Sequence, residues 1–307
     1  MTQVLTVIAP LFLVIAGSAI VACLTHAGEA WSQVLNDFAL HVGFPALVVS
    51  ALAKAGSHLW ELGDVVLANS LFLLAVFGCA LGAGKLFRLS GTAERTLFLC
   101  LGFGNVAYLG IPILVRVRGE AVLPGASLIV AVYLFWIFTL GIGRLEFANH
   151  RESGGALRRT MRGLVRNPLL LSVAAGLFLA GTGIQLPDVV ADALTMVAAS
   201  VTPVVLILIG LFLGRARFGR LSEWTPVLAF SIATLVMLPA GFLGMIVLCG
   251  FSPSDFSTSI IQSAMPLAIT PFALARTYEL DREFIARAIV LSTVLAVVSL
   301  PFWISVL

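Results

Sequence analysis

The sequence predicts an all-α integral membrane protein with ten transmembrane helices. Three observations lead to this prediction. The 307 residues are 60% hydrophobic and only 11% charged, with a mean hydropathy of +1.09, which lies outside the range of soluble domains. The apolar residues fall into ten windows of about 20 residues, the length that crosses a bilayer. The Lys and Arg residues fall almost entirely into alternate loops between these windows.

The ten windows follow one another along the whole chain. A long charged stretch, 144–166, divides them into a first half, 1–143, and a second half, 167–307, and a short polar break occupies 184–192. The first window lacks a preceding Lys or Arg and is too long for the apolar core of a signal peptide, so we interpret it as a membrane helix. The windows are 4–24, 36–53, 64–84, 96–116, 121–143, 167–183, 193–213, 225–249, 256–275 and 287–306.

The basic residues determine the predicted orientation. Of the 18 Lys and Arg residues, 15 lie in the loops after the third, fifth, seventh and ninth helices. Because basic loops stay in the cytoplasm, this distribution places both termini outside. The 15 residues are Lys85, Arg88, Arg95, Arg144, Arg151, Arg158, Arg159, Arg162, Arg166, Arg215, Arg217, Arg220, Arg276, Arg282 and Arg287.

Prolines reveal an internal repeat. Three pairs of prolines, one from each half, are separated by about the same number of residues. Because five helices per half is an odd number, the halves must cross the membrane in opposite orientations, which is the inverted-topology repeat of secondary carriers. The pairs are Pro10 with Pro168, Pro45 with Pro203, and Pro112 with Pro271.

The fourth and ninth helices are predicted to be broken in the middle. Their sequences, TLFLCLGFGNVAYLGIPILVR and FSTSIIQSAMPLAITPFALAR, contain glycines, prolines and amides that interrupt a helix. Backbone groups freed in a membrane need protein or a water-filled cavity around them, so two corresponding breaks predict the central site of a transporter. The N-termini of the half-helices favour an anionic ligand there.

Three side chains inside the predicted helices are the main candidates for chemistry. Asn105 offers two donors and an acceptor at mid-membrane depth and is the strongest candidate for substrate contact; alternatively, it caps the broken helix or bonds to a neighbouring helix. Gln262 opens the second break and contacts substrate or forms an interhelical hydrogen bond. His41 is the one titratable side chain well inside a window, and such a residue is more often a hydrogen-bonded packing residue than a proton carrier.

The remaining candidates lie beside these three. Asn69 forms a polar pair with Ser70 that is expected to face the same cavity, whereas Tyr108 and Met265 either line the pocket or pack against it. The substrate-binding set is completed by Gly104, Val106, Pro266 and Thr270, and the residues expected to shape the crossing are Gly110, Pro112 and Pro271.

Several classes of function are disfavoured by the sequence. No Asp or Glu lies in the central third of a predicted helix, where acids usually mark proton or sodium coupling. The enzyme motifs HExxH and GxSxG and the P-loop are absent, and no metal or cofactor is predicted. The four cysteines lie singly in apolar runs and are expected to be buried. The basic stretch 144–166 is explained by anionic lipid, without nucleic acid, and its pattern allows an amphipathic helix on the membrane surface.

Three segments resemble the auxin efflux carrier family, which includes bacterial members and the plant PIN-formed carriers. They are NDFALHVGFPALVVSAL (36–52), NVAYLGIPIL (105–114) and QSAMPLAITPFALARTY (262–278), and the resemblance runs along essentially the whole chain. Two departures are visible. The large central loop of the plant carriers is absent, and Asn69 stands where they have an acidic residue followed by a lysine.

The resemblance implies a fold like that of the bile acid–sodium symporters. Helices 1, 2, 6 and 7 would form a scaffold, through which a homodimer is the expected assembly. Helices 3–5 and 8–10 would form a transport unit that moves like an elevator. Substrate would bind where helices 4 and 9 cross, with the family's asparagine and proline carried onto Asn105 and Pro112, and its glutamine and prolines onto Gln262, Pro266 and Pro271.

The sequence and the resemblance together predict a secondary carrier that exports a small carboxylate across a bacterial cytoplasmic (inner) membrane. A sodium-coupled symporter of the bile-acid type is the main alternative, although it needs acidic ligands around the crossing. An intramembrane enzyme and a non-transporting receptor are further alternatives.

Overall fold

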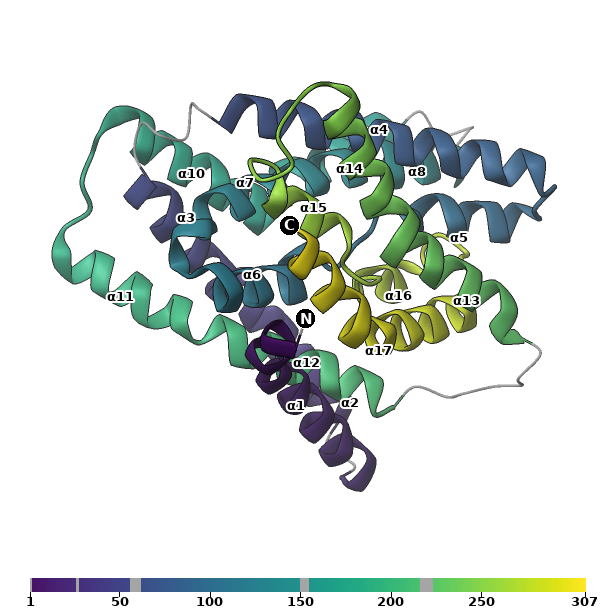
Figure 1. The fold of residues 1–307 in the computed structure, drawn as a ribbon, viewed down its shortest axis with the longest axis horizontal. Coiled ribbons are helices and arrows are strands. Elements are labelled where there is room, and N and C mark those ends of the chain that lie inside the picture. The colour runs from purple at the N-terminus through teal and green to yellow at the C-terminus, as the bar shows by residue number, and fades with distance from the viewer. Residues whose placement is uncertain (1, 26–27, 56–61, 150–154, 216–222) are drawn as a thin grey trace. The chain divides into compact units, whose positions relative to one another are not determined.

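The computed structural model describes residues 2–25, 28–55, 62–149, 155–215 and 223–307. Among them it is all-helical, with one isolated β-bridge and no β-strand (Figure 1). Within the described ranges, seven helical stretches are long and apolar enough to cross a bilayer. The predicted class, an all-helical multi-pass membrane protein, is therefore confirmed.

Each of the seven candidate spans coincides with one predicted window. The sixth window is helix α10 (Pro168–Thr182), and the fourth and ninth windows are interrupted helices described below. The polar break is shorter than predicted, because a helix resumes at Asp188. The seven spans are Val4–Leu24, Ala30–Ala55, Gly63–Leu86, Glu120–Phe147, Asp188–Leu213, Trp224–Leu248 and Arg282–Val306.

The chain forms two compact units, and each unit combines segments from both halves of the sequence. The predicted inverted repeat stays a prediction, because a division by contacts does not test a repeat. The first unit consists of Met1–Val66, Ala107–Ala131 and Arg166–Arg215, and the second of Leu67–Val106, Val132–Val165 and Ala216–Leu307.

The first unit is a layer of paired helices. In it α1 packs along α12, and α3 packs along α10 (Figure 1). A π-helical turn, Ala39–Gly43, joins α2 to α3 without a break. Besides α10, its helices are α1 (Thr2–Leu24), α2 (Gly28–Phe38), α3 (Phe44–Ala55), α6 (Ile111–Arg118), α11 (Asp188–Ala199) and α12 (Val201–Leu213).

Two glycines allow α1 and α12 to approach closely. A Cβ atom at Gly210 would overlap the carbonyl oxygen of Ile15, and one at Gly214 would overlap that of Ala19. Small residues four positions apart are typical of membrane helix pairs in which the backbones touch, because such pairs are stabilised by van der Waals packing. The α1–α12 pair is therefore fixed by the absence of side chains at these two positions.

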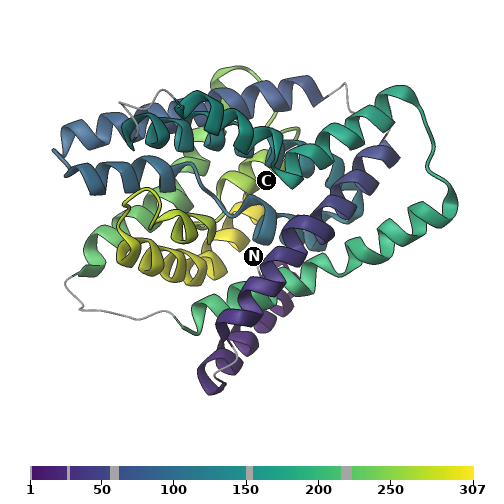
Figure 2. The same ribbon diagram turned by 180° about the vertical axis from the view of Figure 1, so that it is seen from behind.

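The second unit contains the whole of the second interrupted helix and the first part of the first one, which ends at Val106. Helix α7 (Leu123–Trp136) contributes to both units and continues through a π-helical turn, Ile137–Ile142. Figure 2 shows α17 (yellow) beside α13 (green) from behind. The other helices of the second unit are α4 (Gly63–Leu86), α5 (Gly91–Leu101), α8 (Gly143–Asn149), α9 (Ala156–Val165), α13 (Trp224–Ile232), α14 (Leu238–Leu248), α15 (Ser257–Ser263), α16 (Thr270–Leu274) and α17 (Arg282–Val306).

The prediction that all four cysteines are buried is wrong for three of them. Cys100 is buried, whereas Cys23, Cys79 and Cys249 lie on the protein surface. The rule relating apolar residues to burial holds for proteins in water. In a membrane, lipid accepts an apolar side chain as readily as the protein interior does.

Candidate functional site

The first interrupted helix breaks at the glycines of the fourth window. Helix α5 is capped by Ser90, whose Oγ accepts a hydrogen bond from the N–H of Ala93 (3.3 Å), and it ends at Leu101. A Cβ atom at Gly102 would lie 2.8 Å from Cζ of Phe77, so any larger residue would require this ring to shift. After a non-helical stretch the chain becomes helical again in a π-helical turn, Val106–Gly110, which leads into α6.

The second interrupted helix breaks at the prolines of the ninth window. Helix α15 ends at Ser263, and α16 begins at Thr270, with Pro271 in its first turn. Between them the N–H of Leu267 donates to Oγ of Ser292 on α17 (3.2 Å). Since Leu267 is only 1% exposed, Ser292 satisfies a donor that water does not reach.

The two non-helical stretches cross and pair through their main chains. Gly104 and Leu267 form an antiparallel β-bridge. The N–H of Asn105 donates to the carbonyl of Pro266 (2.7 Å), and the N–H of Ala268 donates to the carbonyl of Phe103 (3.0 Å). We call residues 102–106 and 264–269 the crossing. Its main-chain groups therefore find partners in an apolar interior, as such groups must.

Amide and hydroxyl side chains surround the crossing. Gln262 is fully buried and donates from Nε2 to the carbonyl of Val106 (3.2 Å). Asn69 is also fully buried and donates from Nδ2 to Oγ of Ser259 (2.8 Å). Asn105 differs from both. It is 4% exposed, and among the described residues no protein group hydrogen-bonds to its side-chain amide.

A small cavity lies against the crossing inside the second unit. Its volume of about 10 Å³ has room for about one water molecule. Gly104, Met265 and Ser263 contribute to its lining, together with Tyr133 of α7. The hydroxyl of Tyr133 is buried without a hydrogen-bond partner among the described residues. Tyr133, Ser259, Ser263 and Ser292 were not predicted, because single hydroxyls in apolar helices give no sequence signal.

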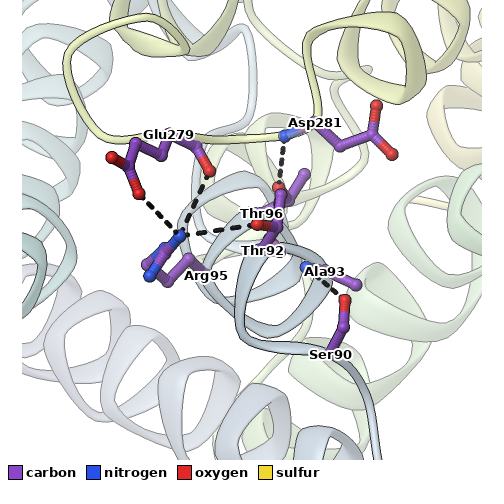
Figure 3. Close-up of polar contacts among 7 residues, drawn as sticks. All are labelled: Ser90, Thr92, Ala93, Arg95, Thr96, Glu279 and Asp281. Atoms are coloured by element: carbon purple, nitrogen blue, oxygen red, sulfur yellow. Dashed lines mark hydrogen bonds and ion pairs between the residues drawn. The ribbon is translucent and has the colours of Figure 1, made fainter.

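The other ends of the two interrupted helices are also joined (Figure 3). The guanidinium of Arg95 on α5 lies 3.4 Å from both the main-chain and the carboxylate oxygen of Glu279, which follows α16. The N–H of Asp281 donates to Oγ1 of Thr96 (2.9 Å), and Oγ1 donates to the carbonyl of Thr92 (2.8 Å). The second unit therefore connects the two interrupted helices at two levels.

The predicted site residues are divided between the units. Gly104, Asn105, Val106, Met265 and Pro266 lie in the crossing, with Gln262, Thr270 and Pro271 beside it and Asn69 on α4 in the same unit.

Tyr108, Gly110, Pro112 and His41 belong to the first unit. There the hydroxyl of Tyr108 lies 3.0 Å from Oδ1 of Asn36, and its ring stacks on Phe44 with a centroid distance of 5.1 Å. Nδ1 of His41 lies 3.1 Å from the carbonyl of Asp37, one turn earlier in the chain. Among the described residues, no group of three His, Cys, Asp or Glu side chains is placed to hold a metal ion.

A multi-pass helical protein whose interior contains two interrupted, crossing helices has the form of a membrane transport protein. Comparison with known families confirms this class. The family of membrane transport proteins matches residues 4–304, and the chain belongs to it. This is the auxin efflux carrier family that the sequence motifs resemble.

Relatives match over nearly their entire lengths. An uncharacterized transporter of Methanothermobacter thermautotrophicus is 27% identical, over 97% of this chain and 96% of the relative. A putative malonate transporter of Rhizobium meliloti is 22% identical, over 97% of this chain and 93% of the relative. The uncharacterized transporter YfdV of Escherichia coli is 19% identical, over 91% of this chain and 89% of the relative.

Proposed function

We propose that this protein is a secondary carrier of a small organic anion, and that the anion binds at the crossing. The observation that carries the proposal is the side-chain amide of Asn105, which is buried beside the crossing without a protein partner. An amide without protein partners in such a place is available to a ligand or to water, which would complete its hydrogen bonds.

The chemistry around Asn105 favours an anion. The segments 102–106 and 262–270 contain no charged residue, so no carboxylate repels an anion there. The chain becomes helical again at Val106 and continues into α6, and the first N–H groups of a helix have no partner within it. This positive end attracts a carboxylate without a buried Arg or Lys.

The substrate class in this proposal is a small carboxylate. The uncharged surroundings of Asn105 favour a single negative charge, whereas the name of the Rhizobium relative points to a dicarboxylate, malonate. Both kinds of acid, including auxin-like aromatic acids, therefore belong in a substrate screen.

The proposed mechanism is alternating access of the elevator type, in a ten-helix inverted repeat like that of the bile acid–sodium symporters. The seven candidate spans support this proposal, in which α10 and the two interrupted helices are the remaining three membrane segments. Basic residues in alternate loops support a cytoplasmic-membrane topology with both termini outside. Export is the proposed direction, and a homodimer through the scaffold helices is the proposed assembly.

Counterflow of labelled carboxylates in proteoliposomes tests the proposal. We expect Asn105→Ala to reduce transport about 10-fold or more, because hydrogen bonds to a charged group contribute about 1.5–3 kcal/mol. Asn105→Asp is expected to abolish transport by repelling the anion. The matched control is Asn167→Asp, which makes the same chemical change at the N-cap of α10, where Asp caps equally well.

The outcomes separate the alternatives. If Asn105→Asp transports as fast as the control Asn167→Asp, the anion does not bind at the crossing. Transport that stops when sodium is replaced by potassium would support the sodium-coupled symporter. Absence of counterflow for every acid, in protein that remains folded, would contradict the carrier.

A further inference from the structure

Helix α9 attaches to the second unit by one narrow face. Residues about four positions apart lie on the same side of a helix. On the attached side Thr160 is 5% exposed, and a Cβ atom at Gly163 would lie 3.2 Å from the ring of Phe138. The small side of α9, formed by Thr160 and Gly163, therefore packs against the π-helical turn that follows α7.

An ion pair fixes α9 in this place. Nε of Arg159 donates to one carboxylate oxygen of Glu146 (2.7 Å), and the hydroxyl of Tyr278 donates to the other (2.8 Å). Glu146 is 8% exposed, so the carboxylate that receives both bonds is largely shielded from water. The orientation of α9 around its own axis is therefore determined.

The second side of α9 is apolar and uncovered. Leu157, Met161 and Val165 are spaced four residues apart and are 61%, 42% and 68% exposed. This stripe continues toward the membrane, because Val165 lies two residues before Asn167, the N-cap of the apolar helix α10.

The third side is basic. Arg158 and Arg162 are four residues apart, next to the apolar stripe, and both are exposed. Neither forms an ion pair or hydrogen bond with another residue in the described part of the chain. An uncovered apolar stripe beside free guanidinium groups is the pattern of helices that lie in the headgroup layer of a membrane.

We propose that α9 is a binding site for anionic phospholipid. Leu157, Met161 and Val165 enter the boundary between headgroups and acyl chains, and Arg158 and Arg162 bind phosphate groups of the cytoplasmic leaflet. Lipid is the occupant because the stripe adjoins a membrane segment and because the free charges are complementary to anionic headgroups. Each arginine strengthens such binding on the order of fivefold.

A spin label at position 161 tests the site without depending on transport. The label is introduced by Met161→Cys in a variant whose surface cysteines are replaced by serine, and its depth is measured from collisions with oxygen and with a water-soluble nickel complex. In vesicles of phosphatidylcholine with added phosphatidylglycerol, we expect the label to be accessible to oxygen and shielded from nickel. The double substitution Arg158→Gln with Arg162→Gln should weaken the binding of α9 to phosphatidylglycerol about 30-fold.

The matched control removes two exposed charges elsewhere in the second unit, Lys85→Gln with Arg276→Gln, and should leave the depth of the label unchanged. A label that stays accessible to nickel in all vesicles would overturn the proposal. So would a label that is immobile in detergent without added lipid, because another protein surface would then cover the stripe. Thermal unfolding of the double arginine variant in detergent confirms that it is folded.

Discussion

The crossing makes a sharp prediction at Ser292. Its Oγ accepts from the N–H of Leu267 (3.2 Å) and donates to the carbonyl of Ala288 (2.6 Å). Ser292→Ala removes the only side-chain atom that reaches the Leu267 donor in the described structure, while the carbonyl of Ala288 keeps its place in the helix. The perturbation is thus one lost partner for one buried N–H group.

The expected magnitude follows from the burial of that group. A buried donor left without a partner costs about 1–3 kcal/mol. If the crossing opens locally, this cost raises the rate of amide hydrogen exchange in residues 264–270 by about 5-fold to about 150-fold. Hydrogen exchange measured by mass spectrometry on peptides from this stretch gives the number directly.

The control is Ser305→Ala on the same helix. Oγ of Ser305 donates to the carbonyl of Phe302 (2.8 Å) and is exposed, so its loss should leave exchange at the crossing unchanged. Equal exchange rates in the two variants would refute the reasoning, because the Leu267 donor would then have no need of Ser292.

Three further predictions concern stability, measured as the Tm in detergent. Gly210→Ala should cost about 1–3 kcal/mol by pushing α1 from α12, whereas Gly241→Ala, with open space around its Cβ, should not lower the Tm; equal Tm values would contradict the close contact. Burial and the bond to Glu146 raise the pKa of the Tyr278 hydroxyl above its ordinary range. Because the pKa is higher in the folded state, the protonated hydroxyl stabilises the fold below about pH 10, and this stabilisation is lost as the pH rises further. The Tm of the unchanged protein should therefore exceed that of Tyr278→Phe by less above about pH 10; a Tm difference that does not change with pH would contradict the raised pKa. Arg95→Gln should cost about 1 kcal/mol or less, since its ion-pair partner Glu279 is largely exposed. Thr96→Val should cost about 1–3 kcal/mol by leaving the Asp281 N–H unpaired; the reverse order would show that charge holds this end of α5.

Much of the fold could be predicted because membrane segments are local signals. Each window is defined by its own apolar residues, and the breaks at Gly102 and Pro266 follow from residues that disturb a helix wherever they occur. The charged stretch 144–166 likewise allowed an amphipathic helix, and α9 lies within it.

The rest depends on partners that the sequence does not connect. The pairing of Asn105 with Pro266 joins residues far apart in the chain, and Ser292 matters only because Leu267 happens to face it. His41 and Tyr108 look equally available as polar residues in apolar helices. The structure pairs His41 with the carbonyl of Asp37, one turn earlier, and Tyr108 with Asn36, which is far away in the chain. Sequence alone does not select either partner.

The main-chain pairing at the crossing has a consequence for the diversity of the family. N–H and carbonyl groups are nearly the same whichever side chain accompanies them, so a junction built from them tolerates replacement of its side chains. If the anion binds at the crossing, as we propose, substitutions around Asn105 and Gln262 would alter which molecule is recognised while the architecture persists. On the same proposal, relatives that are 19–27% identical over nearly their entire lengths would differ in the molecule they carry through a few local replacements, without a new fold.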